Sequence, residues 1–247
     1  MSAFHNEIIN YRIDGISLKG HLIFDPKNNE IRPAVIVAPH WRGCDAFILQ
    51  KATELKSLGY IVFAADVYGD GKTTTTDEES TALMEPLFLD RKLLQERIGA
   101  AFDYLSSHPL VDSTRIGAIG FCFGGLTVIE LLRSGKNVAG AVSFHGVLGD
   151  IKGNLRAAPG ILHEKIKGSL LVLHGADDPL VTKDEILQLE NEMSDKGADW
   201  QIHTYGNTKH AFMNENASNA ASGLEYNPRT AKRAWQSMIN FFNEIFG

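Results

Sequence analysis

Residues 116–125 read IGAIGFCFGG, and this short stretch decides the fold of the chain. An apolar run typical of a buried strand leads into Gly120, and an apolar run typical of a helix follows Gly124. Cys122 stands between the two glycines. A Cβ at either glycine would obstruct a tight backbone approach, so the pattern predicts a sharp strand-to-helix turn with one thiol at its tip.

A cysteine in this position is well placed for nucleophilic attack. Its side chain projects beyond the end of the strand, the N–H of Phe123 faces the same space, and the positive end of the following helix favours the thiolate. The alternative is a buried structural thiol, because free cysteine is among the most frequently buried residues. The strand–turn–helix context favours Cys122 as a nucleophile. Cys44, the only other cysteine, lacks that context and is expected to be structural.

Strand and helix patterns alternate along the rest of the chain. Strands are predicted at 34–38, 61–65, 115–120, 138–144, 170–174 and 200–205, and helices at 47–58, 89–107, 123–133, 183–196 and 228–246. This alternation is typical of an α/β fold, in which helices cover both faces of a mostly parallel sheet. We expect one domain of residues 1–247, opened by an antiparallel hairpin that turns at Asp14-Gly15.

Residues 66–88 interrupt this alternation. The segment is polar and carries glycines and threonines, so it is expected to form a long loop or excursion. Long loops inside compact domains are often functional. We therefore predict that residues 66–88 cover the pocket above the thiol and help to select the substrate.

A nucleophile at a strand-to-helix turn indicates the α/β-hydrolase fold, whose catalytic residues follow one another as nucleophile, acid and histidine. The apolar strand at 170–174 leads into the segment 175–181, GADDPLV. A carboxylate just past a glycine turn at the end of a strand is well placed to orient a histidine. Asp178, directly before Pro179, fits this role better than Asp177, which we interpret as a solvated turn residue.

The base is chosen from nine histidines. His210 lies in the loop at 206–212, between the last predicted strand and the final helix, from which a side chain can reach back over the carboxyl edge of the sheet. The other histidines fall in the hairpin, at helix ends, in strand patterns or in other loops. The sequence therefore predicts a triad of Cys122, Asp178 and His210, in which the imidazole deprotonates the thiol.

The composition limits the class of partner. Net charge is −6, hydrophobic residues make up 44 % and charged residues 22 %, and no basic block occurs. These features argue against nucleic acid and an anionic membrane surface as partners. No apolar run approaches the roughly 20 residues that span a bilayer, and the N-terminus lacks a secretory pattern. We expect a cytoplasmic protein, monomer or homodimer, that acts on a small molecule where thiols stay reduced.

The same motifs resemble those of the dienelactone hydrolase family. The resemblance extends over nearly the whole chain and rests on GFCFGG at 120–125, GADDPLV at 175–181 and HAF at 210–212. It implies a carboxylic ester or lactone hydrolase, similar to carboxymethylenebutenolidase, that works through a cysteine acyl-enzyme. It implies the triad named above, with no cofactor and no metal. It also implies an oxyanion hole formed by the N–H groups of Phe123 and Trp41.

Two departures from the family pattern concern the pocket. Many family members carry a glutamate just before the oxyanion residue, where this chain has His40. Members that cleave dienelactone hold its carboxylate with arginines, one of them shortly after the catalytic histidine, and this chain has no arginine at that place. Arg42 and Arg91 could take over this contact. The residues expected to line the pocket are His40, Arg42, Tyr68, Arg91 and Phe212.

Two rival functions stay open at this point. The first is a non-catalytic binding or signalling protein that retains the hydrolase fold, because a fold alone does not guarantee chemistry. The second is a zinc site at His40 and Cys44, for which the sequence offers no second ligand pair at suitable spacing. The intact triad argues against the first rival, and metal analysis of the purified protein tests the second.

Overall fold

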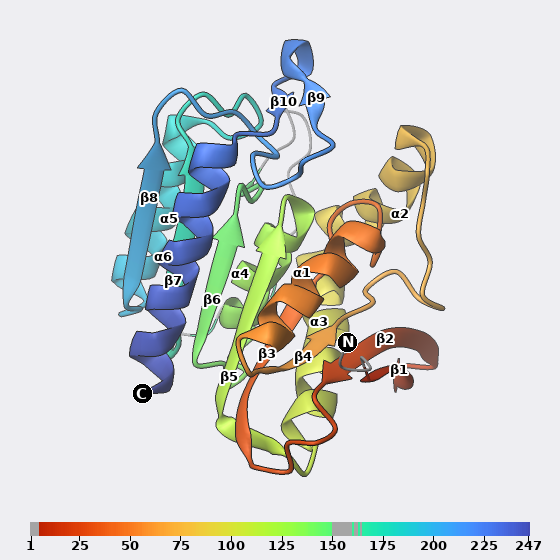
Figure 1. The fold of residues 1–247 in the computed structure, drawn as a ribbon. Coiled ribbons are helices and arrows are strands. Elements are labelled where there is room, and N and C mark those ends of the chain that lie inside the picture. Colours follow the sequence, from red (N-terminus) through yellow and green to blue (C-terminus); the bar gives the residue numbers. More distant parts are fainter. Residues whose placement is uncertain (1–4, 150–159, 161–162, 164) are drawn as a thin grey trace.

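The computed structural model describes residues 5–149, 160, 163 and 165–247. Its centre is an eight-stranded sheet in the order β1-β2-β4-β3-β5-β6-β7-β8 (Figure 1). The strands span His5–Ile13 (β1), Ile16–Phe24 (β2), Arg32–Ala38 (β3), Ile61–Ala64 (β4), Val111–Phe121 (β5), Gly140–Phe144 (β6), Ser169–Gly175 (β7) and Trp200–Tyr205 (β8). β3 to β8 are parallel, whereas β1 and β2 pair antiparallel, so the predicted sheet is confirmed.

The N-terminal hairpin turns at Asp14 and Gly15, as predicted. Both residues have positive φ, 47° and 79°, which is typical of the two-residue turn that matches the right-handed twist of paired strands. Ile13 and Ile16 pair directly across the turn. Because β2 also pairs antiparallel with β4, the hairpin extends one edge of the parallel sheet.

Helices cover both faces of the sheet (Figure 1). One face carries α1 (Ala46–Ser57) and α6 (Pro228–Phe246), and the other carries α3 (Arg91–Ser106), α4 (Phe123–Arg133) and α5 (Lys183–Asp195). Alternate residues of β3 face opposite sides, so Val35 and Val37 belong to the core on the face of α1 and α6, whereas Ile36 belongs to the core on the opposite face. A strand buried on both faces must be apolar at every position, which explains its continuous apolar run.

Residues 66–88 are not a loop throughout, which corrects the prediction for about half of this segment. α2 spans Asp77–Leu89 and begins with a capping box, in which Thr76 accepts the N–H of Glu79 and the Glu79 carboxylate accepts the N–H of Thr76. The acidic first turn suits the positive end of a helix. The Thr-x-x-Glu signal stands in the sequence, but it lies in a run of threonines, and Pro86 is unusual inside a helix.

A second, two-stranded sheet follows the loop of His210. β9 (Ser218–Asn219) and β10 (Leu224–Glu225) pair antiparallel around the 3₁₀ turn Ala220–Ser222. Strands of two residues carry no detectable periodicity, so the sequence did not predict them. In Figure 1 this small sheet and α2 stand apart above the carboxyl ends of the central strands. Among the described helices, none is both long enough and apolar enough to cross a membrane.

Candidate active site

The turn at Cys122 has the geometry that its flanking glycines predict. Cys122 joins β5 to α4 with φ 55° and ψ −118°, a conformation that residues with a side chain rarely adopt. A Cβ on Gly120 would lie 1.9 Å from the carbonyl oxygen of Gly124. A Cβ on Gly124 would lie 2.6 Å from the carbonyl oxygen of Ala38. Only glycine fits at these two positions, so the surrounding backbone holds the strained turn in place.

Backbone hydrogen bonds fix this turn and leave the N–H of Phe123 without an acceptor among the described residues. The N–H of Cys122 donates to the carbonyl oxygen of Phe144 at 3.1 Å, and the N–H of Gly125 donates to that of Cys122 at 2.9 Å. The N–H of Phe123 donates to no described residue. Because α4 begins at Phe123, this N–H belongs to the positive end of the helix and is available to an anionic oxygen.

Asp178 and His210 come together from separate parts of the chain. Asp178 follows β7, and His210 lies in the loop between β8 and α6. Nδ1 of His210 is 2.8 Å from Oδ2 of Asp178, and both side chains are almost fully buried. Oδ1 of Asp178 accepts the N–H of Leu180 at 2.9 Å, so each carboxylate oxygen has a partner. Asp177 is exposed, and the carboxylate beside the imidazole is that of Asp178.

The second nitrogen of His210 is left for Cys122. Nε2 is buried and makes no hydrogen bond of good geometry to a described residue. Burial by itself lowers the pKa of His210, but the neighbouring Cys122 and Asp178 outweigh it and raise this pKa to about 10. A thiolate stabilises an imidazolium in this way when the two groups are close. The three side chains therefore stand in the order thiol, imidazole and carboxylate.

A second free N–H lies in the Trp41 turn, the name used below for residues 40–43. The N–H of Gly43 closes this turn on the carbonyl oxygen of His40 at 2.9 Å. The N–H of Trp41 donates to no residue that the structure describes. A Cβ on Gly124 would also lie 2.8 Å from the carbonyl oxygen of Pro39, so the Trp41 turn and the turn at Cys122 are neighbours. Two unpaired N–H groups are thus found in adjacent turns.

A cavity of about 700 Å³ opens over these residues. Cys122, His210 and Trp41 line it, together with side chains of α2 and of the β9–β10 region. Its apolar lining includes Phe47, Met84, Phe88, Val147, Leu180 and Leu224. Its polar lining includes Thr81, Asn214, Asn216, Ser218 and Asn219. The cavity therefore offers space for a small organic molecule beside the thiol.

Two of the five residues expected in the pocket, His40 and Arg42, line the cavity. The other three are buried and are absent from the described lining residues, so the expectation does not hold for them. The hydroxyl of Tyr68 donates to the carbonyl oxygen of Trp41. The guanidinium of Arg91 donates to the carbonyl oxygen of Gly149, after β6. The ring of Phe212 packs edge-to-face with that of His145. A sequence pattern near a pocket does not show whether a side chain points into the cavity or into the core.

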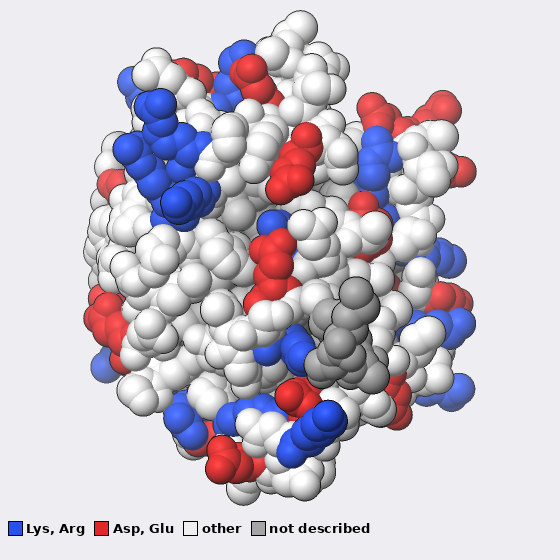
Figure 2. Space-filling model, viewed as in Figure 1, with Lys and Arg blue, Asp and Glu red and all other residues white. Residues whose placement is uncertain are grey.

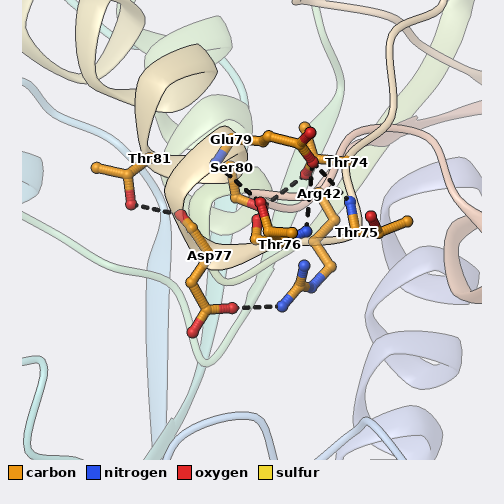
Figure 3. Close-up of polar contacts among 8 residues, drawn as sticks. All are labelled: Arg42, Thr74, Thr75, Thr76, Asp77, Glu79, Ser80 and Thr81. Atoms are coloured by element: carbon orange, nitrogen blue, oxygen red, sulfur yellow. Dashed lines mark hydrogen bonds and ion pairs between the residues drawn. The ribbon is translucent and has the colours of Figure 1, made fainter.

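The lining histidine and arginine both have acidic neighbours. Nε2 of His40 lies 3.0 Å from Oδ1 of Asp45, although the angle is poor for a hydrogen bond. Burial disfavours the charge of Asp45, but His40 and two backbone N–H groups of α1 lower its pKa. Arg42 pairs with Asp77 at the start of α2 (Figure 3). Figure 2 shows acidic side chains gathered over this end of α2, which carries three acidic residues in its first turn.

His145 is a site residue that the sequence did not predict. It lines the cavity directly after β6 and has a φ of 38°. Its ring centroid is 5.0 Å from that of His210, and neither ring nitrogen has a hydrogen-bond partner among the described residues. Burial, followed by the nearby His210, keeps the pKa of His145 well below its usual value, which favours the neutral ring. The sequence does hold a signal for this residue, because His145 directly follows an apolar strand, as the segment that contains Asp178 does.

The described residues contain no group of three or more His, Cys, Asp or Glu side chains arranged to hold a metal ion. Zinc binds cysteine as the thiolate. Burial raises the pKa of the Cys44 thiol to about 12, and the nearby carboxylates of Asp45 and Asp66 act in the same direction. The surroundings of Cys44 therefore oppose the zinc site that His40 and Cys44 suggested.

Known proteins share both the sequence pattern and the fold. The pattern of the dienelactone hydrolase family matches residues 20–246. The solved structure of a dienelactone hydrolase-like promiscuous phosphotriesterase from metagenomic libraries is 32 % identical, covers 99 % of this chain and 100 % of its own, and has a TM-score of 0.89. Carboxymethylenebutenolidase of Rhodococcus opacus is 26 % identical over 208 residues, 81 % of this chain and 76 % of its own length. The solved structure of an α/β-hydrolase enzyme from a deep-sea metagenome library is 14 % identical, covers 100 % of this chain and 99 % of its own, and has a TM-score of 0.69. The predicted α/β-hydrolase fold is therefore confirmed.

Proposed function

Because the chain belongs to the dienelactone hydrolase family, we propose that it hydrolyses carboxylic esters or lactones through an acyl-enzyme on Cys122. The family and the hydrolase class, both predicted from the motifs, are confirmed by this membership. One observation carries the finer proposal. His210 contacts Asp178 at 2.8 Å, and Cys122 is the neighbour that raises the pKa of the same imidazole.

Acylation begins from an ion pair. His210 has taken the proton of the Cys122 thiol, and Asp178 orients and stabilises the resulting imidazolium. The sulfur forms a bond to the carbonyl carbon, and the carbonyl electron pair moves onto the oxygen. The N–H groups of Trp41 and Phe123 stabilise this oxyanion, each by about 3 kcal/mol. The C–O bond to the alcohol then breaks, and His210 protonates the departing oxygen.

Deacylation uses the same groups with water as the nucleophile. The water oxygen attacks the thioester carbon while His210 accepts one of its protons. The C–S bond breaks, and the sulfur leaves as the thiolate, which restores the ion pair with His210. The sum is one ester and one water converted to one acid and one alcohol, a balance that needs no cofactor.

The charges around the cavity support an uncharged substrate. Arg42 is the one lysine or arginine among the described lining residues, and it is already paired with Asp77. Asp45 and Glu85 add two further acidic side chains to the lining. A substrate carboxylate would be repelled by these groups unless it displaced Asp77 from Arg42. We therefore propose that neutral esters or lactones are turned over faster than carboxylate-bearing ones, dienelactone included.

The setting of the enzyme is part of the proposal. A reducing compartment keeps thiols free, so we propose a cytoplasmic enzyme. We propose that residues 1–247 act as one domain, as a monomer or homodimer, with a small-molecule substrate and neither nucleic acid nor membrane as partner. Within the segment 66–88, α2 is the part proposed to cover the pocket, since Met84 and Phe88 line the cavity.

The deciding experiment is hydrolysis of an ester and lactone panel by the wild type, Cys122→Ala and the matched control Cys44→Ala. The panel includes dienelactone, a neutral analogue of it, and a phosphotriester, because a relative 32 % identical is called a promiscuous phosphotriesterase. We expect the wild type and Cys44→Ala to cleave neutral esters. We expect Cys122→Ala to lose at least about 10⁴-fold in kcat, since removal of a triad nucleophile abolishes the covalent route.

Two other outcomes would contradict the proposal. Full activity of Cys122→Ala would refute the acyl-enzyme on this cysteine. No turnover of any panel member, together with no reaction between Cys122 and iodoacetamide, would favour a non-catalytic binding or signalling protein that retains the fold.

A further inference from the structure

The Trp41 turn is held through its carbonyl groups. The carbonyl oxygens of His40, Trp41, Arg42 and Gly43 each accept a hydrogen bond, at 2.9, 2.9, 3.0 and 3.0 Å. Their donors are, in the same order, the N–H of Gly43, the hydroxyl of Tyr68, the N–H of Thr74 and the N–H of Asp45. Two of these donors lie in the segment 66–76, outside the turn. The carbonyls of the turn are therefore all occupied, whereas the N–H of Trp41 stays free.

Tyr68 contacts the residues of both free N–H groups. Its hydroxyl donates to the carbonyl oxygen of Trp41 at 2.9 Å. Its ring stacks on that of Phe123, with centroids 6.2 Å apart and 9° between the planes. Trp41 follows β3 and Phe123 begins α4, so one side chain joins two separate elements. We propose that Tyr68 is a positioning residue, which holds the two N–H groups of the oxyanion hole at a fixed distance from one another.

Tyr68 is itself firmly held. The buried carboxylate of Asp66 accepts the N–H groups of Lys19, Tyr68, Gly69 and Gly71 at 2.8 to 3.0 Å. Burial, followed by the nearby Cys122 and Asp66, raises the pKa of Tyr68, so its hydroxyl stays protonated and continues to donate at any ordinary assay pH. An anchored ring with a protonated hydroxyl is suited to fixing a neighbouring peptide group.

The segment 66–76 also lies against the turn without a gap. A Cβ on Gly43 would lie 2.4 Å from the carbonyl oxygen of Lys72, so backbone packs directly on backbone there. An oxyanion hole depends on both donors meeting one oxygen, and an error of about 1 Å in placement can cost about 10²-fold in rate. Loss of a whole donor costs about 10²- to 10³-fold. Loosening one donor should therefore have a smaller effect, about tenfold.

The test compares Tyr68→Phe, which keeps the stacked ring and loses the donor, with the wild type and with Tyr104→Phe. Tyr104 is a half-buried tyrosine whose hydroxyl makes no hydrogen bond to a described residue, so its variant is a matched control. Three quantities are measured: kcat and KM for a neutral p-nitrophenyl ester, the affinity of butyraldehyde, and the rate of Cys122 alkylation by iodoacetamide. The aldehyde adds to the thiol and places its oxygen in the hole, whereas alkylation makes no oxyanion.

The inference rests on the proposed function and expects a specific split. Tyr68→Phe should lose about tenfold in kcat and about tenfold in aldehyde affinity, with KM and the alkylation rate changed less than twofold. Unchanged kcat and aldehyde affinity would overturn the inference, and so would an equal fall in the alkylation rate, which would indicate general damage to the site. If Tyr68→Phe does not fold, Tyr68→Gln, which removes the stacking ring, decides by the same split. Wild-type turnover that does not need Cys122 would instead refute the proposed function.

Discussion

The Cys122 turn, residues 120–124, and the Trp41 turn, residues 40–43, are built alike. Each needs a glycine whose Cβ would strike a backbone carbonyl, Gly120 in the first and Gly43 in the second. Each leaves the N–H proposed for the oxyanion hole, of Phe123 in the first and of Trp41 in the second, without an acceptor among the described residues. A cysteine accompanies each turn, since Cys122 lies within the first and Cys44 directly follows the second. Close glycine packing therefore does not separate the two thiols, although only Cys122 has a positive φ.

Their neighbours do separate them. Cys122 lies beside the imidazole of His210, whose pKa it helps to raise to about 10. Burial raises the pKa of Cys44 to about 12, and Asp45 and Asp66 add to this effect. Backbone geometry presents a thiol, but the charges around it decide whether it ionises.

The largest expected difference between the turns is in thiol reactivity. At pH 7 a thiol with a pKa of about 12 is ionised to only about one part in 10⁵, and the thiolate is the form that reacts. We expect iodoacetamide to modify Cys122 at least about 10²-fold faster than Cys44. Mass spectrometry of the two peptides after timed alkylation measures both rates. Comparable rates would show that the neighbours do not govern the reactivity of these thiols.

The next effect concerns the carboxylate that supports the imidazole. Asp178→Asn keeps the shape of the side chain and removes the charge that helps to hold His210 as an imidazolium. We expect a loss of about 10³-fold in kcat, because the imidazole is left in the wrong tautomer. Asp177→Asn is the control, since Asp177 is the exposed neighbour in sequence. A larger loss for Asp177→Asn would reverse the assignment of the acid.

Glycine substitutions test whether both turns depend on close backbone packing. A Cβ would lie 1.9 Å from a carbonyl oxygen at Gly120 and 2.4 Å from one at Gly43. We expect Gly120→Ala and Gly43→Ala each to lower the free energy of unfolding by about 3 kcal/mol. Gly206→Ala, with nothing within 4 Å of its Cβ, should change it by less than about 0.5 kcal/mol. Urea denaturation measures all three, and equal values would contradict the packing argument.

The smallest effect comes from His145, the buried histidine whose ring contacts that of His210. His145 has a pKa lowered well below 6.5 by burial and by His210 and His40. As the pH falls below 6.5, the unfolded state binds a proton that the folded state does not, so stability is lost in that range. This contributes a slope of at most about 1.4 kcal/mol per pH unit. The stability of His145→Phe should therefore fall less steeply than that of the wild type between pH 6.5 and pH 5, and parallel curves would contradict a lowered pKa.

Much of the candidate site could be predicted because its residues stand at the ends of regular elements. The glycines around Cys122 have a local purpose, since the carbonyl that excludes a Cβ at Gly120 lies only four residues away. Asp178 and His210 follow the last two strands of a parallel sheet, and the carboxyl ends of such strands share one edge. The same reasoning applies to His145, which directly follows the strand β6 of this sheet.

The prediction was weakest where the direction of a side chain mattered. Tyr68, Arg91 and Phe212 are expected from the sequence to line the pocket, yet they are absent from the described lining of the cavity. The sequence predicts a loop where the structure has α2, because the capping box of this helix is surrounded by residues typical of loops. In both cases the local pattern was compatible with more than one structure, and packing against distant elements selected one of them.

The amino-acid sequence by itself determined the alternation of strands and helices, the sharp turn that presents Cys122, and the family. These features depend on residues within a few positions of each other, through periodicity, glycine and capping. Tertiary structure decided which side chains meet. Asp178 and His210 are 32 residues apart, and Trp41 and Tyr68 are 27 residues apart. Contacts across such distances form only when whole elements pack, because no local preference of the backbone can specify them.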